Sequence, residues 1–144
     1  MSSKISDTNP NNEEFVSAPA LTGISELSKE ELNALPFGAI QLDGKGNVCS
    51  FNDYEAKLTG RDQKNVIGKN FFTEVAPCTN VRSFAGRYME GVEKGELHAI
   101  FPYRFDFRMS PRDVTVTLFY HKQTDTGWVF VREIKKPVET QSPA

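Results

Sequence analysis

Two cysteines and two histidines are the residues of this 144-residue chain with the clearest capacity for nucleophilic or metal chemistry. Cys78 could form a thiol–imidazole pair with His98 or His121, in which the imidazole takes the thiol proton and the thiolate attacks a substrate. Their spacing does not support such a pair. Cys49 does not complete a metal site either, because no two of these residues have the short separation typical of zinc ligands. The residues therefore favour neither a thiol enzyme nor a metal centre.

Cys78 lies in the run Val75-Ala76-Pro77-Cys78-Thr79, which we expect to be a loop. A lone cysteine is most often a small buried apolar residue. Pro77 fixes its own backbone, however, and a thiol that follows it in a loop can be held pointing in one direction. Both interpretations remain open from the local residues.

Glu55 is the second candidate, because it lies beside the aromatic residues Phe51 and Tyr54. In a short helix this carboxylate would be solvated or would help to cap the helix. If it is buried instead, loss of hydration raises its pKa and makes the carboxyl a proton donor. The pattern alone does not decide between these alternatives.

A strand is predicted over residues 101–109, because large apolar residues recur there at every second position. Such a stripe offers a flat lining for a planar ligand, although it is also typical of an ordinary core. Pro102 removes one backbone donor and so favours an edge strand or a bulge. The residues of the stripe, which project from one sheet face, are Phe101, Tyr103, Phe105, Phe107 and Met109.

The other elements follow from caps, turns and periodicity. Ser28 and Glu31 have capping-box spacing, which predicts a short helix that ends before Pro36. Asn52 predicts the start of a second helix, and Gly60 its end. These helices and the strands predict an α+β sandwich. The further expected elements are a longer helix over 83–94, a hairpin of strands 38–42 and 48–51 whose glycines serve a turn rather than a phosphate loop, and strands over 114–120 and 128–134.

Composition limits the class of protein. The net charge is −2, whereas a general nucleic-acid binder is expected to carry an excess of positive charge, so the composition argues against that class. We find neither the apolar stretch of a signal peptide nor the roughly 20 apolar residues that cross a bilayer, so we expect a cytoplasmic protein with reduced thiols. Polar ends predict a flexible leader over residues 1–25 and a flexible tail over 136–144, around one domain of residues 26–135.

Several runs within residues 35–134 carry a resemblance to a known family. They are Phe37-Gly38-Ala39-Ile40-Gln41-Leu42-Asp43-Gly44, Thr59-Gly60-Arg61-Asp62, Val66-Ile67-Gly68-Lys69-Asn70-Phe71-Phe72, Val75-Ala76-Pro77-Cys78-Thr79 and Trp128-Val129-Phe130-Val131. The segment resembles the photoactive yellow protein family of blue-light sensors, and the Ala-Pro-Cys-Thr stretch distinguishes it from generic PAS domains. The resemblance implies a PAS fold, with a central five-stranded antiparallel sheet flanked by short helices and one longer connecting helix.

The resemblance also implies a ligand, 4-hydroxycinnamic (p-coumaric) acid, joined to Cys78 as a thioester whose carbonyl the Cys78 N–H would hold. Glu55 matches the family's buried acid, which hydrogen-bonds the phenolate oxygen of this chromophore. Thr59 and Arg61 match residues that support the site and shield its mouth. Further pocket positions are matched by Phe71, Val75, Ala76, Thr79, Phe105, Phe107 and Met109.

The function implied is that of a light receptor and not of an enzyme. Light would twist the cinnamyl double bond from trans to cis, and we expect the proton of Glu55 then to pass to the phenolate. An ionised Glu55 in apolar surroundings is costly, and opening of the fold with release of the leader would relieve that cost. We expect a monomer with an unidentified downstream signalling partner and with no nucleic-acid or membrane partner.

Phe51 departs from the family pattern, in which a tyrosine shares the phenolate with the glutamic acid. Phenylalanine has no hydroxyl, so one donor is missing, and Thr59 or a water could replace it. We expect a red-shifted main absorption band and a higher chromophore pKa, with a protonated, bluer-absorbing fraction in the dark.

Three other functions remain as alternatives. One is a PAS domain that is not photoactive and that binds another small ligand or mediates dimerisation. The others are a thiol enzyme acting through Cys78 and a flavin-binding PAS sensor, for which the cysteine stands in the wrong local motif. Cys78 and Glu55 favour the light sensor, whereas Phe51 leaves room for the first alternative.

Overall fold

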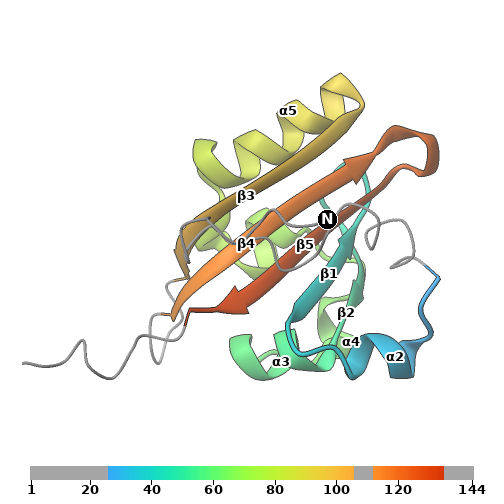
Figure 1. The fold of residues 1–144 in the computed structure, drawn as a ribbon, viewed down its shortest axis with the longest axis vertical. Coiled ribbons are helices and arrows are strands. Elements are labelled where there is room, and N and C mark those ends of the chain that lie inside the picture. The colour runs from blue at the N-terminus through green and yellow to red at the C-terminus, as the bar shows by residue number, and fades with distance from the viewer. Residues whose placement is uncertain (1–25, 106–111, 135–144) are drawn as a thin grey trace, which may run out of the picture.

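A five-stranded antiparallel sheet in the order β2-β1-β5-β4-β3 forms the centre of the fold (Figure 1). The computed structural model describes residues 26–105 and 112–134. The predicted fold class, such a sheet flanked by short helices, is confirmed. The strands are β1 (Gly38–Leu42), β2 (Val48–Phe51), β3 (Glu96–Phe105), β4 (Arg112–His121) and β5 (Thr126–Glu133).

The predicted hairpin of β1 and β2 is confirmed at both strands. Asp43 stabilises its turn, because one carboxylate oxygen accepts hydrogen bonds from the N–H groups of Lys45 and Asn47, each at 2.9 Å. Gly46 adopts a φ of 89°, a left-handed conformation that glycine adopts without steric cost. The Gly-rich segment is therefore a turn, as its sequence predicts.

Short helices lie at the end of the sheet formed by β1 and β2, whereas the longer α5 (Arg87–Lys94) runs along β3 (Figure 1). The predicted capping box is present, since Ser28 Oγ accepts from Glu31 N–H at 3.1 Å and the Glu31 carboxylate accepts from Ser28 N–H at 2.8 Å. Gly60 ends the second helix with a φ of 74°, as predicted. The short helices are α2 (Lys29–Asn33), α3 (Asp53–Thr59) and α4 (Gln63–Val66), and η5 (Lys122–Thr124) is a single turn between β4 and β5.

The helix predicted over 83–94 is only partly correct. Its first part, η4 (Arg82–Gly86), is a π-helical turn in which Gly86 N–H donates to Val81 C=O at 3.1 Å, and the α-helix begins at Arg87. Hydrophobic spacing could not reveal the difference, because both conformations keep Phe84 and Tyr88 buried. Gly95 ends the helix, as predicted.

The expected loop around Cys78 is also wrong in detail. A π-helical segment, η2 (Phe71–Val75), is followed by a 3₁₀ turn, η3 (Pro77–Thr79), so Cys78 occupies the middle of a helical turn. Pro77 lies at the first position of this turn, where its missing N–H costs no hydrogen bond.

Both faces of the sheet are packed, which follows from the alternation of side chains along each strand. The face toward α5, η2 and η4 bears the main core, which includes Ile40, Leu42, Val116, Leu118, Val129, Val131, Phe71, Phe84 and Tyr88. On the outer face, Trp128 and Phe130 stack with ring centroids 5.5 Å apart, and Leu32 of α2 packs against them.

The aromatic stripe of β3 is confirmed for its first three members. Phe101 and Phe105 are buried and Tyr103 is half-buried, all packed in or against the main core. Phe107 and Met109, which we also expected on this face, lie outside the described residues. Pro102 lies on β3, an edge strand, as its missing N–H predicts.

Candidate ligand-binding site

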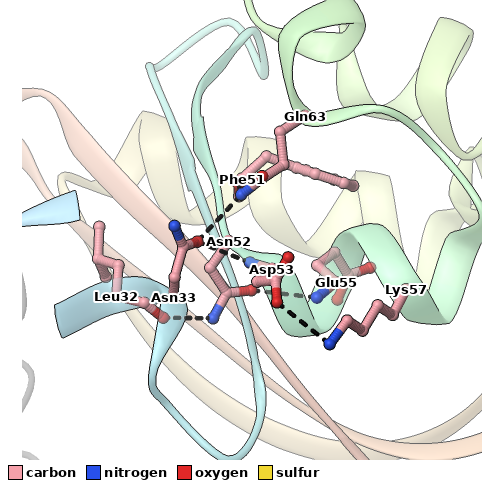
Figure 2. A network of polar contacts seen from close by, with 8 residues as sticks. All are labelled: Leu32, Asn33, Phe51, Asn52, Asp53, Glu55, Lys57 and Gln63. Atoms are coloured by element: carbon pink, nitrogen blue, oxygen red, sulfur yellow. Dashed lines mark hydrogen bonds and ion pairs between the residues drawn. The ribbon is translucent and has the colours of Figure 1, made fainter. Parts of the chain in front are cut away.

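Glu55 is held by the start of α3. Asn52 caps this helix, since its side-chain oxygen accepts a hydrogen bond from Glu55 N–H at 3.1 Å (Figure 2). The same oxygen accepts from Ala39 N–H of β1 at 2.9 Å. The Glu55 carbonyl in turn accepts from the Thr59 hydroxyl at 2.8 Å. The backbone of Glu55 is therefore fixed against the sheet.

The same asparagine ties α2 to this point. Its amide nitrogen donates to Leu32 C=O at 2.8 Å and to Phe37 C=O at 3.0 Å, so all the hydrogen-bonding groups of a side chain that is 2% exposed are used. A second link runs through Gln63, whose amide donates to Asn33 Oδ1 at 3.0 Å and to Phe51 C=O at 2.8 Å (Figure 2).

The carboxyl of Glu55 is fully buried, and neither of its oxygens has a hydrogen-bond partner among the described residues. Burial raises the pKa of Glu55 from 4.5 to about 8, because the charged form loses its hydration. The alternative of a solvated or capping carboxylate is thereby excluded. At neutral pH the carboxyl keeps its proton and can donate it in a hydrogen bond, which makes this buried group a candidate ligand contact.

Cys78 is half-buried in η3 and packs against the main core. Its carbonyl accepts a hydrogen bond from the Tyr103 hydroxyl at 2.5 Å, which joins the cysteine turn to β3. Thr79 is fully buried, and its hydroxyl donates to Ala76 C=O at 2.7 Å. The turn that carries the thiol is thus fixed on two sides.

Apolar residues from distant parts of the chain form the wall beside this turn. Phe84 joins them, because its ring lies 6.2 Å from Phe71, 5.0 Å from Tyr103 and 6.2 Å from Phe105, measured between centroids. The predicted pocket residues that belong to the same main core are Phe51, Phe71, Val75, Ala76 and Phe105. Phe107 and Met109, predicted for the same wall, lie outside the described residues.

Two of these positions were not identified as site residues from the sequence. Tyr103 and Phe84 were assigned only to a strand stripe and a helix face, and their contacts with Cys78 and Phe71 join segments far apart in the chain. The position of Tyr103 between Phe101 and Phe105 on one strand face was the available signal.

The ends of α3 and the residues beside them include three more of the predicted site residues, which are Phe51, Thr59 and Arg61. The Phe51 ring is buried and brings no hydroxyl. Thr59 Oγ1 accepts from Arg61 N–H at 3.2 Å while it donates to Glu55 C=O, so its single proton is already used. The Arg61 side chain is exposed.

The other residues considered for chemistry are dispersed. Cys49 is exposed on β2, and His98 and His121 are exposed residues beside Phe119 on the outer sheet face. Among residues 26–105 and 112–134, no group of three or more His, Cys, Asp or Glu side chains is arranged to hold a metal ion. In the same residues, no helix is long and apolar enough to cross a membrane.

Two surface hollows lie away from Glu55 and Cys78. One, of about 770 Å³, runs along η4 and α5, and another, of about 360 Å³, lies between α2, β2 and α4; neither is lined by either residue. The buried carboxyl and the half-buried thiol are therefore the features that indicate a ligand.

Comparison with known proteins places these residues in a family context. A family model described as PAS fold matches residues 27–131. Photoactive yellow protein of Halochromatium salexigens is 47% identical over 111 residues, 77% of this chain and 89% of that protein. That of Rhodothalassium salexigens is 42% identical over the same shares of the two chains. Among solved structures, the photoactive yellow protein domain of the sensor histidine kinase Ppr from Rhodospirillum centenum has a TM-score of 0.74 at 47% identity, covering 77% of this chain and 97% of that chain.

Proposed function

The chain belongs to the photoactive yellow protein family and is a photoreceptor domain with the PAS fold, and from this premise we propose that it senses blue light through a p-coumaroyl thioester on Cys78. One observation carries the proposal furthest. Glu55 presents a fully buried carboxyl with no hydrogen-bond partner among residues 26–105 and 112–134, which suits the phenolic oxygen of that chromophore.

Loading of the chromophore requires an activated acyl group. Cys78 Sγ would attack the carbonyl of an activated p-coumaric acid, forming a C–S bond and displacing the activating group, while the thiol proton leaves to solvent or base. The bound group supplies absorption of blue light and a trans-to-cis isomerisation of its double bond. Cys78 N–H would hold the thioester carbonyl, and Phe71, Val75 and Phe105 would line the ring.

Glu55 is the proton donor in this proposal. Burial keeps the proton on the acid at neutral pH, so in the dark the neutral carboxyl would donate a hydrogen bond to the phenolate of the bound group. Once isomerisation altered the geometry of that bond, the Glu55 carboxyl oxygen would give its proton to the phenolate oxygen.

The ionised Glu55 would then be a charge without a partner in an apolar site, which destabilises the closed fold. Asn52 connects Glu55 to Leu32 and Phe37, so a shift of α3 would strain the attachment of α2. We propose that this connection carries the signal toward the predicted leader, residues 1–25, which lie outside the described residues, and from there to a signalling partner.

Phe51 weakens the stabilisation of the phenolate. Thr59 would have to break its bond to the Glu55 carbonyl before it could donate to a ligand, so a water is the favoured replacement for the missing hydroxyl. With Phe51 supplying no donor, the site would stabilise the phenolate less, which would raise the chromophore pKa and leave part of the chromophore protonated in the dark.

Reconstitution tests the proposal directly. The purified chain is incubated with activated p-coumaric acid, and a yellow product that blue light bleaches reversibly is expected. Cys78→Ala should remain colourless, whereas Cys49→Ala should become yellow like the wild type because Cys49 is an exposed thiol on β2. A wild-type chain that stays colourless would favour a PAS domain that binds another ligand, and colour that depends on Cys49 would contradict the attachment site.

A further inference from the structure

Gly38, the first residue of β1, lies where neighbouring atoms leave no room for a side chain. A Cβ atom built at this position would collide with a carboxyl oxygen of Glu55, and it would lie 3.2 Å from the carboxyl carbon and 3.4 Å from Val131 C=O. Glycine is not required here by the backbone, because Gly38 is not among the glycines with positive φ. Glycine is therefore required at this position because it has no side chain.

Gly60 and Gly68 show a different pattern. They have φ values of 74° and 90°, and no atom of the described residues lies within 4 Å of an added Cβ, so conformation and not space explains them. Gly38 has the opposite properties, and the atom that fills the place of its side chain is the polar end of Glu55.

The surrounding backbone has little freedom to yield. Gly38 pairs with Val131 of β5, and its neighbour Ala39 donates to the buried Asn52 side chain that also caps α3. The end of the Glu55 side chain is the part that can move when a methyl group is added. Its carboxyl would be displaced from the β1 backbone.

We propose that Gly38 is a positioning residue, which leaves room for the Glu55 carboxyl against β1 and so sets the place from which this carboxyl meets the ligand's phenolic oxygen. The contact with the ligand's phenolic oxygen rests on the proposed function, whereas the placing of the Glu55 carboxyl by Gly38 does not. A hydrogen bond weakens steeply with distance and angle, so a displaced carboxyl stabilises the phenolate differently.

Gly38→Ala tests this inference in two states of the protein. In the ligand-free chain, the δ-carboxyl carbon of Glu55, labelled with ¹³C, is titrated by NMR, and we expect its titration midpoint to shift by about one pH unit, tenfold in the proton-binding constant. In the reconstituted chain, the absorption maximum and the chromophore pKa should both move.

Gly44→Ala is the matched control. There an added Cβ would lie 2.5 Å from a carboxylate oxygen of Asp125, so the same substitution displaces a carboxylate on an exposed residue. This variant should leave the Glu55 titration and the chromophore band unchanged. If Gly38→Ala folds poorly, the double variant Gly38→Ala/Glu55→Asp, which shortens the acid by one methylene group, should restore stability.

The outcomes separate the inference from the function. A Glu55 titration and an absorption band in Gly38→Ala equal to those of the wild type would overturn the positioning role, as would a double variant no more stable than Gly38→Ala. If no form of the chain takes up the chromophore, the proposed function fails, and the ligand-free titration still decides whether Gly38 positions Glu55.

Discussion

Glu55 and Phe51 are the residues whose chemistry defines the proposed site. Glu55 is a buried acid that keeps its proton at neutral pH, and Phe51 is a buried apolar ring at the position where the resemblance implies a tyrosine. Burial of Glu55 could not be decided from its sequence neighbours, because the same turn of helix allows a solvated and a buried face. Its carboxyl lies against Gly38, which belongs to a different element of the chain.

Glu55→Gln should remove a pH dependence of stability. The unfolded chain ionises Glu55 near pH 4.5 and the folded chain near pH 8, so the free energy of unfolding decreases as the pH rises through this window and is constant above it. The loss amounts to about 5 kcal/mol at most in the ligand-free protein. Urea denaturation of both proteins at pH 5 and pH 8 measures it. A wild-type decrease no larger than that of the glutamine variant would contradict the buried acid.

Phe51→Tyr should restore a donor to the phenolate. We expect the main absorption band to shift to the blue and the chromophore pKa to decrease, because the ionised form gains a hydrogen bond. An absorption titration of the reconstituted proteins tests this expectation. Phe119→Tyr, on the outer sheet face, is the control and should leave both values unchanged. Identical spectra and pKa values for wild type and Phe51→Tyr would refute the proposed effect of Phe51.

At the scale of elements, α3 carries Glu55 and η3 carries Cys78, the two groups that the proposed function uses, and the two elements differ in how well their sequences predict them. Asn52 and Gly60 are local signals, and α3 begins and ends where they predict. The turns that precede and contain Cys78 also begin at local signals, since the Asn70 side chain caps η2 and Pro77 opens η3, but neither signal distinguishes a π-helical or 3₁₀ turn from a loop. The hydrogen bond from Tyr103 to Cys78 joins residues 25 positions apart, so local sequence patterns could not predict it.

Asn52→Ala tests the junction of α2, β1 and α3. The substitution leaves Ala39 N–H and the carbonyls of Leu32 and Phe37 without their partner, and it removes the cap of Glu55 N–H. A loss of about 2–4 kcal/mol in the free energy of unfolding is expected. Asn65→Ala, at an exposed position of α4, should change it by less than about 0.5 kcal/mol. Equal losses in the two variants would show that Asn52 does not stabilise the junction.

At the scale of the whole molecule, the sheet separates the proposed site from an outer apolar cluster. Helix α2 contacts both the outer cluster and the cap of α3 beside the site. Leu32 packs against Trp128 and Phe130, while its carbonyl accepts from Asn52 beside the site. The five-stranded sheet and its two packed faces could be predicted from period-two patterns and from the family runs. The order in which the strands pair and the position of η4 could not, because both depend on long-range contacts.

Illumination should loosen α2 if the proposed connection carries the signal. In the reconstituted protein, backbone amides of α2 and of the leader, residues 1–25, should exchange with deuterium faster in blue light than in the dark, and the central strand β5 should be unaffected. Hydrogen-exchange mass spectrometry of both states measures this difference. Cys78→Ala should show none, and equal exchange in light and dark for the wild type would exclude this route.

Proton transfer from Glu55 is the central claim, and a light-minus-dark infrared difference spectrum tests it most directly. The reconstituted protein carries ¹³C-labelled glutamate, so that carboxyl bands of Glu are identified by their isotope shift. We predict loss of the band of one protonated carboxyl on illumination with gain of a carboxylate band, both missing in Glu55→Gln. A bleached wild-type protein whose protonated Glu carboxyl band does not change would contradict the account.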